Sequence, residues 1–314
     1  MKKILRFTLR TLLVLFVLLN IITVFHAYKF THFYEHAEKP VHAQAGGKGW
    51  PVIRDILFGA KAYKQLNQVP DSNFESVTLT TRDGIRLDAW YIPTAQPSAR
   101  GTVILFHGHG ARKTAVLDES AGFRQLGFHT LLVDFRAHGS SEGKECTIGY
   151  KESEDVLLAY QYIRSKTDQP IILWGISMGA AAITAAMDQY PELKPSRLIL
   201  EMPFASLHQA AEGRIKLMGL PGEPLGTFVT FWGSVVTGTW AFNHQPARFA
   251  SRINIPTLVQ WGRHDPRVLQ EETDAVFNAL AGKKKLVVYE QSGHESLCDK
   301  EHEKWMASVS SFLL

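Results

Sequence analysis

Ser177 lies between Gly175 and Gly179 in the stretch IILWGISMGA, residues 171–180. Small residues on both sides allow a strand and a helix to approach closely around a serine in a strained backbone conformation. An apolar strand before the serine and a helix after it are the setting of a G-x-S-x-G nucleophile elbow. The stretch therefore predicts a nucleophilic Ser177, against the alternative of a serine that only caps a helix.

A nucleophilic serine needs a base, and the base needs an acid that orients it. His294 stands in QSGHES, just after the last apolar run, and Asp265 stands in WGRHDPR, just after the preceding one. We predict that His294 is the base and Asp265 the acid, in the chain order serine, aspartate, histidine. The competitors are His264, which adjoins Asp265, and Glu201, which ends another apolar run.

Acyl transfer through a serine also needs two N–H donors for the negative charge that develops on the substrate oxygen. The backbone N–H of Met178, the residue after the serine, is the first expected donor. The second is expected at the backbone N–H of His109, in the loop that ends GTVILFHGHG, residues 101–110. We expect the ring of His107 to brace this loop rather than to transfer protons.

A further loop, DFRAHGSSEG at 134–143, carries charged side chains. We expect Asp134 and Arg136 to fix this loop, with substrate contact as the alternative. Because it ends an apolar run, it should lie beside the loop at 107–110.

The elements that must position these residues alternate between apolar strands and amphipathic helices. Such alternation predicts an α/β fold with a parallel sheet covered on both faces, and a ligand site beyond the carboxyl ends of the strands. Apolar and polar residues alternate on both sides of Asp83-Gly84 in the stretch SVTLTTRDGIRLDAWYI. This pattern predicts an antiparallel hairpin before that sheet. The expected strands lie within 101–110, 128–141, 170–179, 196–204, 255–265 and 284–294, and the clearest helices within 152–166, 178–188 and 269–281.

Residues 206–250 interrupt the alternation. This segment is rich in glycine and aromatic residues, as in LGTFVTFWGSVVTGTWAF. It predicts a short helical insertion after a strand whose end faces the site. We favour a lid that lines an apolar substrate pocket over a simple cover for one end of the sheet.

The N-terminus has the pattern of a membrane segment. Basic residues precede the apolar run TLLVLFVLLNIITVFHAY, which suits an uncleaved anchor better than a cleaved signal or a buried helix. Basic residues on this side predict a cytoplasmic N-terminus and a catalytic domain outside the cytoplasm, periplasmic or extracytoplasmic, or secreted after cleavage. We therefore divide the chain into an anchor or signal segment at 1–28, a tether at 29–73 and a catalytic domain at 74–314.

Charge and cysteine content exclude several functions. Of 314 residues, 45% are hydrophobic and 20% are charged, which is ordinary for a globular protein. The net charge of +4 is matched by the basic leader alone, so the remainder has no electrostatic footprint for nucleic acid. The cysteines, Cys146 and Cys298, are too few for a zinc cluster and could be two buried thiols or one disulfide.

From Phe74 to the C-terminus the chain resembles the α/β-hydrolase superfamily. The matching features are the H-G loop at 107–110, DFRAHGSS, the GISMG elbow, GRHD and SGH. Their combination is similar to the monoglyceride-lipase, lysophospholipase and serine-aminopeptidase-like branch and its membrane-anchored members. The resemblance implies a triad of Ser177, Asp265 and His294, no metal and no organic cofactor. One departure is Ala137, where the branch commonly has glycine.

The resulting expectation is a membrane-tethered serine hydrolase of the carboxylic-ester class (EC 3.1.1-like) that cleaves a small-molecule or lipid acyl ester through an acyl-enzyme. A peptidase or amidase on the same scaffold is the alternative, with Glu201 or Glu223 as an anchor for a substrate amine. The alternative outside enzymes is a membrane-tethered binding protein without catalytic activity. Labelling by a fluorophosphonate probe would separate an enzyme from such a protein.

Overall fold

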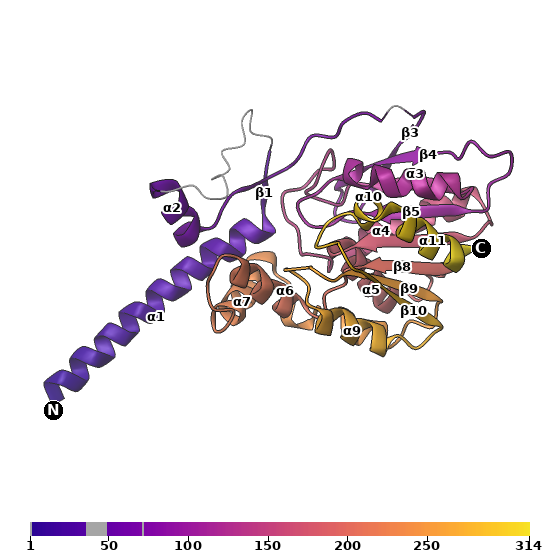
Figure 1. Cartoon of the computed structure of the whole chain (residues 1–314). Coiled ribbons are helices and arrows are strands. Elements are labelled where there is room, and N and C mark those ends of the chain that lie inside the picture. The colour runs from indigo at the N-terminus through magenta and orange to yellow at the C-terminus, as the bar shows by residue number, and fades with distance from the viewer. Residues whose placement is uncertain (1, 36–48, 71) are drawn as a thin grey trace.

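The computed structural model describes residues 2–35, 49–70 and 72–314, and an eight-stranded sheet forms its centre (Figure 1). The strand order is β10-β9-β8-β7-β5-β6-β4-β3. β3 and β4 form an antiparallel hairpin, β4 is also antiparallel to β6, and the remaining neighbours are parallel. The predicted mostly parallel sheet with an N-terminal antiparallel hairpin is therefore confirmed.

The strands are β1 (Phe33–Tyr34), β2 (Ala62–Tyr63), β3 (Glu75–Thr80), β4 (Arg86–Ile92), β5 (Thr102–Phe106), β6 (His129–Val133), β7 (Ile171–Ile176), β8 (Arg197–Glu201), β9 (Thr257–Gly262) and β10 (Lys284–Tyr289). The helices are α1 (Lys2–Thr31), α2 (Trp50–Phe58), η1 (Lys113–Val116), α3 (Leu117–Gln125), α4 (Glu152–Lys166), α5 (Met178–Gln189), α6 (Leu207–Leu217), α7 (Leu225–Thr237), η2 (Ala241–Asn243), α8 (Pro246–Ala250), α9 (Gln270–Ala279), α10 (Leu297–Lys300) and α11 (His302–Leu313).

The central strands are mostly apolar because both faces of the sheet are buried. Along β5, Val103 and Leu105 point into one hydrophobic cluster, whereas Ile104 and Phe106 point into another. Side chains of consecutive strand residues face opposite sides, so both sets of positions in such a strand favour apolar residues. Full burial of each aliphatic side chain contributes about 1.5–3 kcal/mol.

Helices close both clusters. α4, α5, α8 and α9 contribute to the cluster on one face of the sheet, and α3 and α11 to the cluster on the other. Cys146 belongs to the first cluster and Cys298 to the second, and both are free, buried thiols. The structure thus has two buried thiols on opposite faces of the sheet, and no disulfide joins them.

α1 extends away from the body as a long helix with its N-terminus at the far end (Figure 1). Among the described residues it is the one helix whose length and composition would allow it to cross a membrane. Its second half packs along α7: the Phe16 and Phe228 rings lie 6.0 Å apart, and Trp232 Nε1 donates a hydrogen bond to Asn20 Oδ1 at 3.0 Å. The segment at 206–250 is helical as predicted, with α6, α7, η2 and α8.

The end of α1 is joined to the body. The carbonyl of Thr31 accepts a hydrogen bond from the Cys146 N–H at 2.7 Å, and the Phe33 N–H donates to the Lys144 carbonyl at 2.8 Å. Phe33 is buried in the same core cluster as β5. Of the expected tether at 29–73, residues 36–48 and 71 lie outside the described residues. The described start of that segment is part of the packed structure.

Candidate active site

The turn between β7 and α5 presents Ser177. Its φ of 54° and ψ of −112° lie outside the regions that a residue with a side chain prefers, at a cost of about 1–3 kcal/mol. The flanking glycines make this turn possible, because a Cβ at Gly179 would lie 2.2 Å from the Phe106 carbonyl oxygen and one at Gly175 would lie 2.5 Å from the carbonyl carbon of Gly179. The Ser177 N–H donates to the Glu201 carbonyl at 2.8 Å, which ties the turn to β8.

The structure brings Ser177, His294 and Asp265 together. His294 Nε2 lies 3.0 Å from Ser177 Oγ, and His294 Nδ1 lies 2.7 Å from Asp265 Oδ2. The side chain of Asp265 is fully buried and that of His294 is 10% exposed. An imidazole held in this way can accept the serine proton at Nε2 while the carboxylate stabilises the resulting charge.

Asp265 is fixed by its own loop. Its Oδ1 accepts the backbone N–H groups of Arg267 at 2.8 Å and Val268 at 3.0 Å, which leaves Oδ2 facing the imidazole. A Cβ at Gly213 of α6 would lie 2.7 Å from the Arg267 carbonyl oxygen, so this glycine lets α6 pack against the loop. The competitor His264 is exposed and has neither of these contacts with Asp265 among the described residues.

Glu201, the competitor for the acid, lies in the core. Its Oε1 accepts hydrogen bonds from the indole N–H of Trp174 at 2.9 Å and of Trp305 at 2.7 Å. Burial, together with the nearby Glu119 carboxyl, raises the pKa of Glu201 to about 8. Among the described residues, the Glu201 side chain therefore contacts the indoles of Trp174 and Trp305, whereas it is Asp265 that contacts His294.

The loop after β5 lies over Ser177. A Cβ at Gly108 would lie 3.7 Å from the Cβ of Ser177, and the next residue, His109, lines the same hollow as the serine. His107 Nδ1 donates to the Gly108 carbonyl at 2.8 Å, and its Nε2 accepts from the Phe135 N–H at 3.2 Å. Burial lowers the pKa of His107 to about 3, which keeps the ring neutral and suited to bracing the loop.

The ring of His109 connects the same loop to α1. Its Nε2 donates to the carbonyl of Phe30 at 2.9 Å, and burial lowers its pKa well below the ordinary value. The ring also packs between Phe30 and Phe33, with centroid distances of 4.8 and 5.2 Å. Met178 is the first residue of α5, where helix geometry leaves the N–H without a partner in its own helix.

Asp134 is held by a buried cation that the sequence did not single out. Lys113 Nζ lies 2.6 Å from Asp134 Oδ2 and 3.1 Å from Asp88 Oδ2, with no exposure of the lysine side chain. Burial opposes ionisation of Asp134, but Lys113, His107 and the hydrogen bond from the Ser140 N–H together outweigh it and hold the pKa below its ordinary value. The sequence pattern gives no sign that Lys113 is a buried cation, because its partners Asp88 and Asp134 are distant in sequence.

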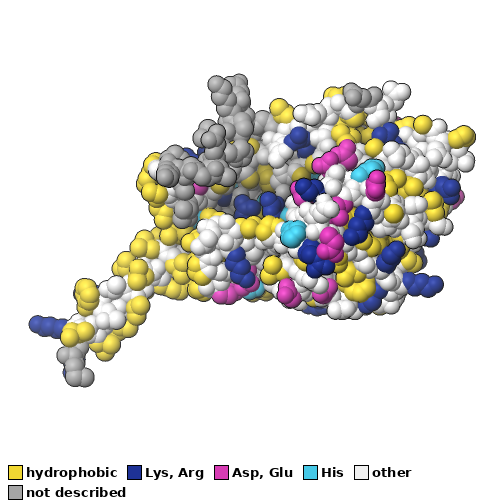
Figure 2. Space-filling view, viewed as in Figure 1, with side chains coloured by type: hydrophobic (Ala, Val, Ile, Leu, Met, Phe, Trp, Pro, Cys, Tyr) yellow, Lys and Arg dark blue, Asp and Glu magenta, His cyan; other side chains and the backbone are white. Residues whose placement is uncertain are grey.

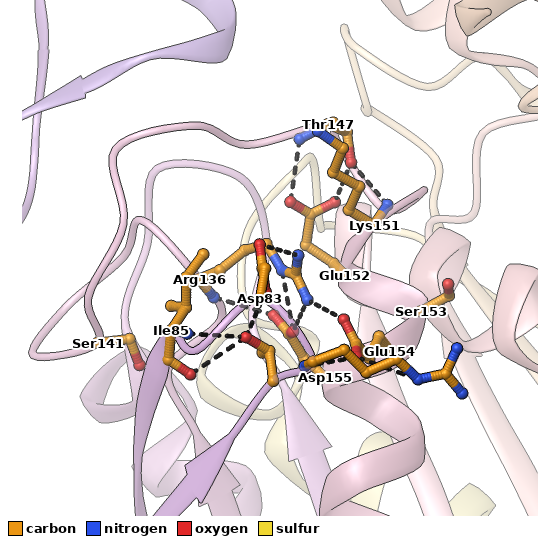
Figure 3. A network of polar contacts seen from close by, with 12 residues as sticks. Asp83, Ile85, Arg136, Ser141, Thr147, Lys151, Glu152, Ser153, Glu154 and Asp155 are labelled. Carbon is orange, nitrogen blue, oxygen red and sulfur yellow. Dashed lines mark hydrogen bonds and ion pairs between the residues drawn. The ribbon is translucent and has the colours of Figure 1, made fainter. Parts of the chain in front are cut away.

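Arg136 fixes the loop at 134–143 to the start of α4 (Figure 3). Its Nη2 lies 2.6 Å from Asp155 Oδ1 and 2.9 Å from Glu154 Oε2. The expected loop-fixing contacts of Asp134 and Arg136 are thus present in the structure. Ala137 has a φ of 63°, in the left-handed region. This conformation costs a non-glycine residue about 1–2 kcal/mol. The position at which this chain has alanine in place of the branch's common glycine is therefore one where glycine would be less strained.

Ser177 and His294 open into a hollow of about 1110 Å³. Its walls come from the end of α1, the segment after α2, the loop at 107–111 and α6. Figure 2 shows basic side chains gathered in the recess between α1 and the body. Neither Glu201 nor Glu223, the candidate anchors for a substrate amine, lines this hollow.

One group in the described part of the chain has the residue types of a metal site. The ligand atoms of His208, Glu212 and Glu223, on α6 and the turn before α7, lie within 4.8 Å of one another. His208 Nε2 lies 2.8 Å from Glu223 Oε1. This contact joins α6 to the turn before α7.

Comparisons with known proteins agree with this architecture. Residues 97–228 match the profile of the family described as serine aminopeptidase, S33. An uncharacterized protein of Mycobacterium tuberculosis is 27% identical over 223 residues, which cover 69% of this chain and 71% of that protein. The α/β hydrolase domain-containing protein WAV2 of Arabidopsis thaliana is 31% identical over 139 residues, 43% of this chain and 44% of its own.

Solved structures of the same fold include esterases. The Pyrococcus furiosus esterase Pf2001 superposes with a TM-score of 0.64 at 23% identity, over 80% of this chain and 97% of its own. An acetyl xylan esterase from Paenibacillus sp. R4 gives 0.60 at 19% identity, over 79% and 87%. At these identities the likeness shows the fold alone.

Proposed function

Because the chain belongs to the α/β-hydrolase superfamily, we propose that it is a serine hydrolase that cleaves an acyl ester through a Ser177–His294–Asp265 triad. The observation that carries the proposal is the continuous contact from Ser177 Oγ to His294 Nε2 at 3.0 Å and from His294 Nδ1 to Asp265 Oδ2 at 2.7 Å. Three side chains from separate strand ends meet there in the order that proton transfer requires.

The reaction proceeds in two halves. Ser177 Oγ attacks the ester carbonyl while His294 Nε2 takes the serine proton, and Asp265 stabilises the imidazolium. His294 then gives that proton to the leaving alcohol, and the acyl group stays on Ser177. Water, deprotonated by His294, attacks the acyl-enzyme and releases the carboxylic acid.

We assign the stabilisation of the developing oxyanion to two backbone N–H groups. Met178 begins α5, whose positive dipole end points at the serine, and His109 lies in the loop over Ser177. Each donor in such a site contributes about 10²–10³ to kcat. The fixed neutral ring of His109 holds the loop that carries the second donor.

An ester is favoured over a peptide as the substrate. The related folds include proteins described as esterases, and neither carboxyl considered as an amine anchor lines the hollow. The segment at 206–250 contributes α6 to one wall of the hollow, which supports its role as a lid over an apolar acyl group. A peptidase would instead release nitroaniline from aminoacyl p-nitroanilides, and that substrate serves as the contrasting assay.

The membrane assignment rests on α1. We assign residues 1–28 as an uncleaved anchor, with the catalytic domain outside the cytoplasm, because α1 packs along α7 and its last turn contacts His109. Cleavage would remove most of these contacts. The mass of the mature protein from the membrane fraction tests this, and a chain that begins near residue 46 would contradict it.

The test of the enzymatic proposal uses the full chain in neutral detergent. It should react with a fluorophosphonate probe and hydrolyse p-nitrophenyl esters, and Ser177→Ala should abolish labelling and lower kcat by about 10⁶, as expected when triad members act as a unit. Ser165→Ala, which removes the hydroxyl of an exposed serine at the end of α4, is the matched control and should keep both properties. Hydrolysis that survives Ser177→Ala would contradict the assignment.

A further inference from the structure

The hollow beside Ser177 has an unusual charge. Besides Ser177 and His294, it is lined by the basic residues Lys29, Lys61, Arg214 and Arg267. They come from the end of α1, the segment after α2, α6 and the loop that carries Asp265. Four segments distant in sequence therefore deliver cationic side chains to the same space as the proposed nucleophile.

Within the described residues, no carboxylate lies within 4.0 Å of any of these four charged groups. Aromatic rings support three of them instead. The Arg214 guanidinium lies 4.5 Å from the centroid of Phe30, and the Lys29 and Lys61 ammonium groups lie 4.5 and 5.1 Å from the centroid of Tyr34. Such contacts orient a cation but leave its charge uncompensated.

The acidic residues that line the hollow offset only part of its charge. Asp55 is paired with Arg54 at 2.6 Å. Burial raises the pKa of Glu119 to about 7, and its Oε1 accepts the hydroxyl of Ser296. The Glu295 carboxylate, which accepts the Gly293 N–H at 3.3 Å, is one negative charge against four cations. The charge of the hollow therefore remains positive.

Like charges that share a partly enclosed space repel one another. Desolvation and the neighbouring Arg267 lower the pKa of Arg214, although the side chains of both residues are still exposed to the solvent of the hollow. A protein keeps such an arrangement at a cost in stability, which an anion placed between the cations would reverse. The end of α1 forms one wall of the hollow. If α1 spans a membrane, this end is the point at which the chain leaves the bilayer.

We propose that this hollow recognises an anionic headgroup, of the phosphate type, on the alcohol side of the acyl ester, with Arg214 and Arg267 as the principal contacts and Lys29 and Lys61 at its edge. The inference rests on the proposed ester hydrolysis and names its substrate class. Guanidinium groups match phosphate oxygens with paired hydrogen bonds, whereas an ammonium acts as a point charge. The ester carbonyl would meet Ser177 while the headgroup meets the basic wall.

The hydrolysis test compares two substrates that differ only in the headgroup: 1-myristoylglycerol and 1-myristoylglycerol 3-phosphate, with the full chain in neutral detergent. The wild-type chain should prefer the phosphate ester in kcat/KM by about tenfold or more, the range of a charge-assisted contact. Arg214→Gln should remove this preference mainly through KM for the phosphate ester, with a smaller loss on the neutral ester. Arg214→Lys should restore part of it.

The matched control is Lys216→Gln, which removes a cation from the same helix at a position outside the hollow. This variant should keep the preference. An equal loss for both esters in Arg214→Gln, or equal rates on both esters in the wild-type chain, would overturn the headgroup site and leave ester hydrolysis standing.

A binding test separates this inference from the proposed function. Octyl phosphate should bind saturably to the Ser177→Ala chain by calorimetry, and about tenfold more weakly once Arg214→Gln is added. If neither ester is hydrolysed but this binding holds, ester hydrolysis is wrong and the anion site stands. Absence of Arg214-dependent binding would overturn the site, as would inorganic phosphate that binds as tightly as octyl phosphate, because the site would then serve free phosphate.

Discussion

Glu201→Gln tests whether the buried carboxyl at the end of β8 is neutral and separate from the catalytic contacts. The substitution keeps the side-chain oxygen that accepts the indole N–H groups of Trp174 and Trp305 at 2.9 and 2.7 Å. It removes only the ability to ionise. A glutamine has nearly the same shape, so the core packing around it should remain.

The magnitude follows from the pKa of Glu201, which rises from its ordinary 4.5 to about 8 in the folded state because of burial and the nearby Glu119. The folded chain therefore keeps a proton that the unfolded chain has lost between these two values. This contribution is fully present below pH 4.5 and disappears as the pH rises through 8. Its loss lowers the free energy of unfolding by about 1.4 kcal/mol per pH unit in that window.

The assay is urea unfolding of both chains in neutral detergent at pH 6 and pH 8. Between these pH values the stability of the wild-type chain should fall by about 2 kcal/mol more than that of Glu201→Gln. Hydrolysis of a p-nitrophenyl ester should stay within about threefold, because Asp265 and not Glu201 contacts His294. Parallel pH dependences would refute the neutral carboxyl, and a large loss of kcat at unchanged stability would make Glu201 the orienting acid.

Asp265→Asn should lower kcat by about 10⁴ at unchanged melting temperature, because an amide at this position stabilises the wrong tautomer of His294; ester kinetics measure it, and full activity would exclude the acid role. Gly179→Ala should destabilise the fold by about 3 kcal/mol or more, since its Cβ would lie 2.2 Å from the Phe106 oxygen; a wild-type denaturation midpoint would contradict the tight elbow. Arg136→Leu should cost about 3–5 kcal/mol, because it leaves the carboxylates of α4 buried without their cation; a loss below 1 kcal/mol would show that the network of Figure 3 is dispensable.

The contact between α1 and the site affects how all of these experiments are designed. A chain without residues 1–28 would lose the packing of α1 on α7. It would also weaken the last turn of α1, where the Phe30 carbonyl accepts a hydrogen bond from the His109 ring. Such a truncation would perturb the loop assigned to the oxyanion. The full chain in detergent is therefore the form in which activity should be measured.

Much of the fold was predictable because its signals are local. The hairpin around Asp83-Gly84 and the helix at 152–166 match β3, β4 and α4, since alternation and amphipathic spacing act over a few residues. The glycines around Ser177 predicted the tight turn that the φ of 54° and the Cβ distances show. The roles of Ser177, Asp265 and His294 remain predictions that the geometry supports.

The sequence by itself determined which residues could do chemistry and on which strand ends they stand, because side-chain type and short-range pattern are properties of the chain. Only the tertiary structure decided which of them meet: it placed Asp265 rather than Glu201 against His294, and set Lys113 against Asp134. It also gathered Lys29, Arg214 and Arg267 around the hollow. These contacts join residues far apart in the chain, and their energies depend on burial and distance, which exist only once the chain has folded.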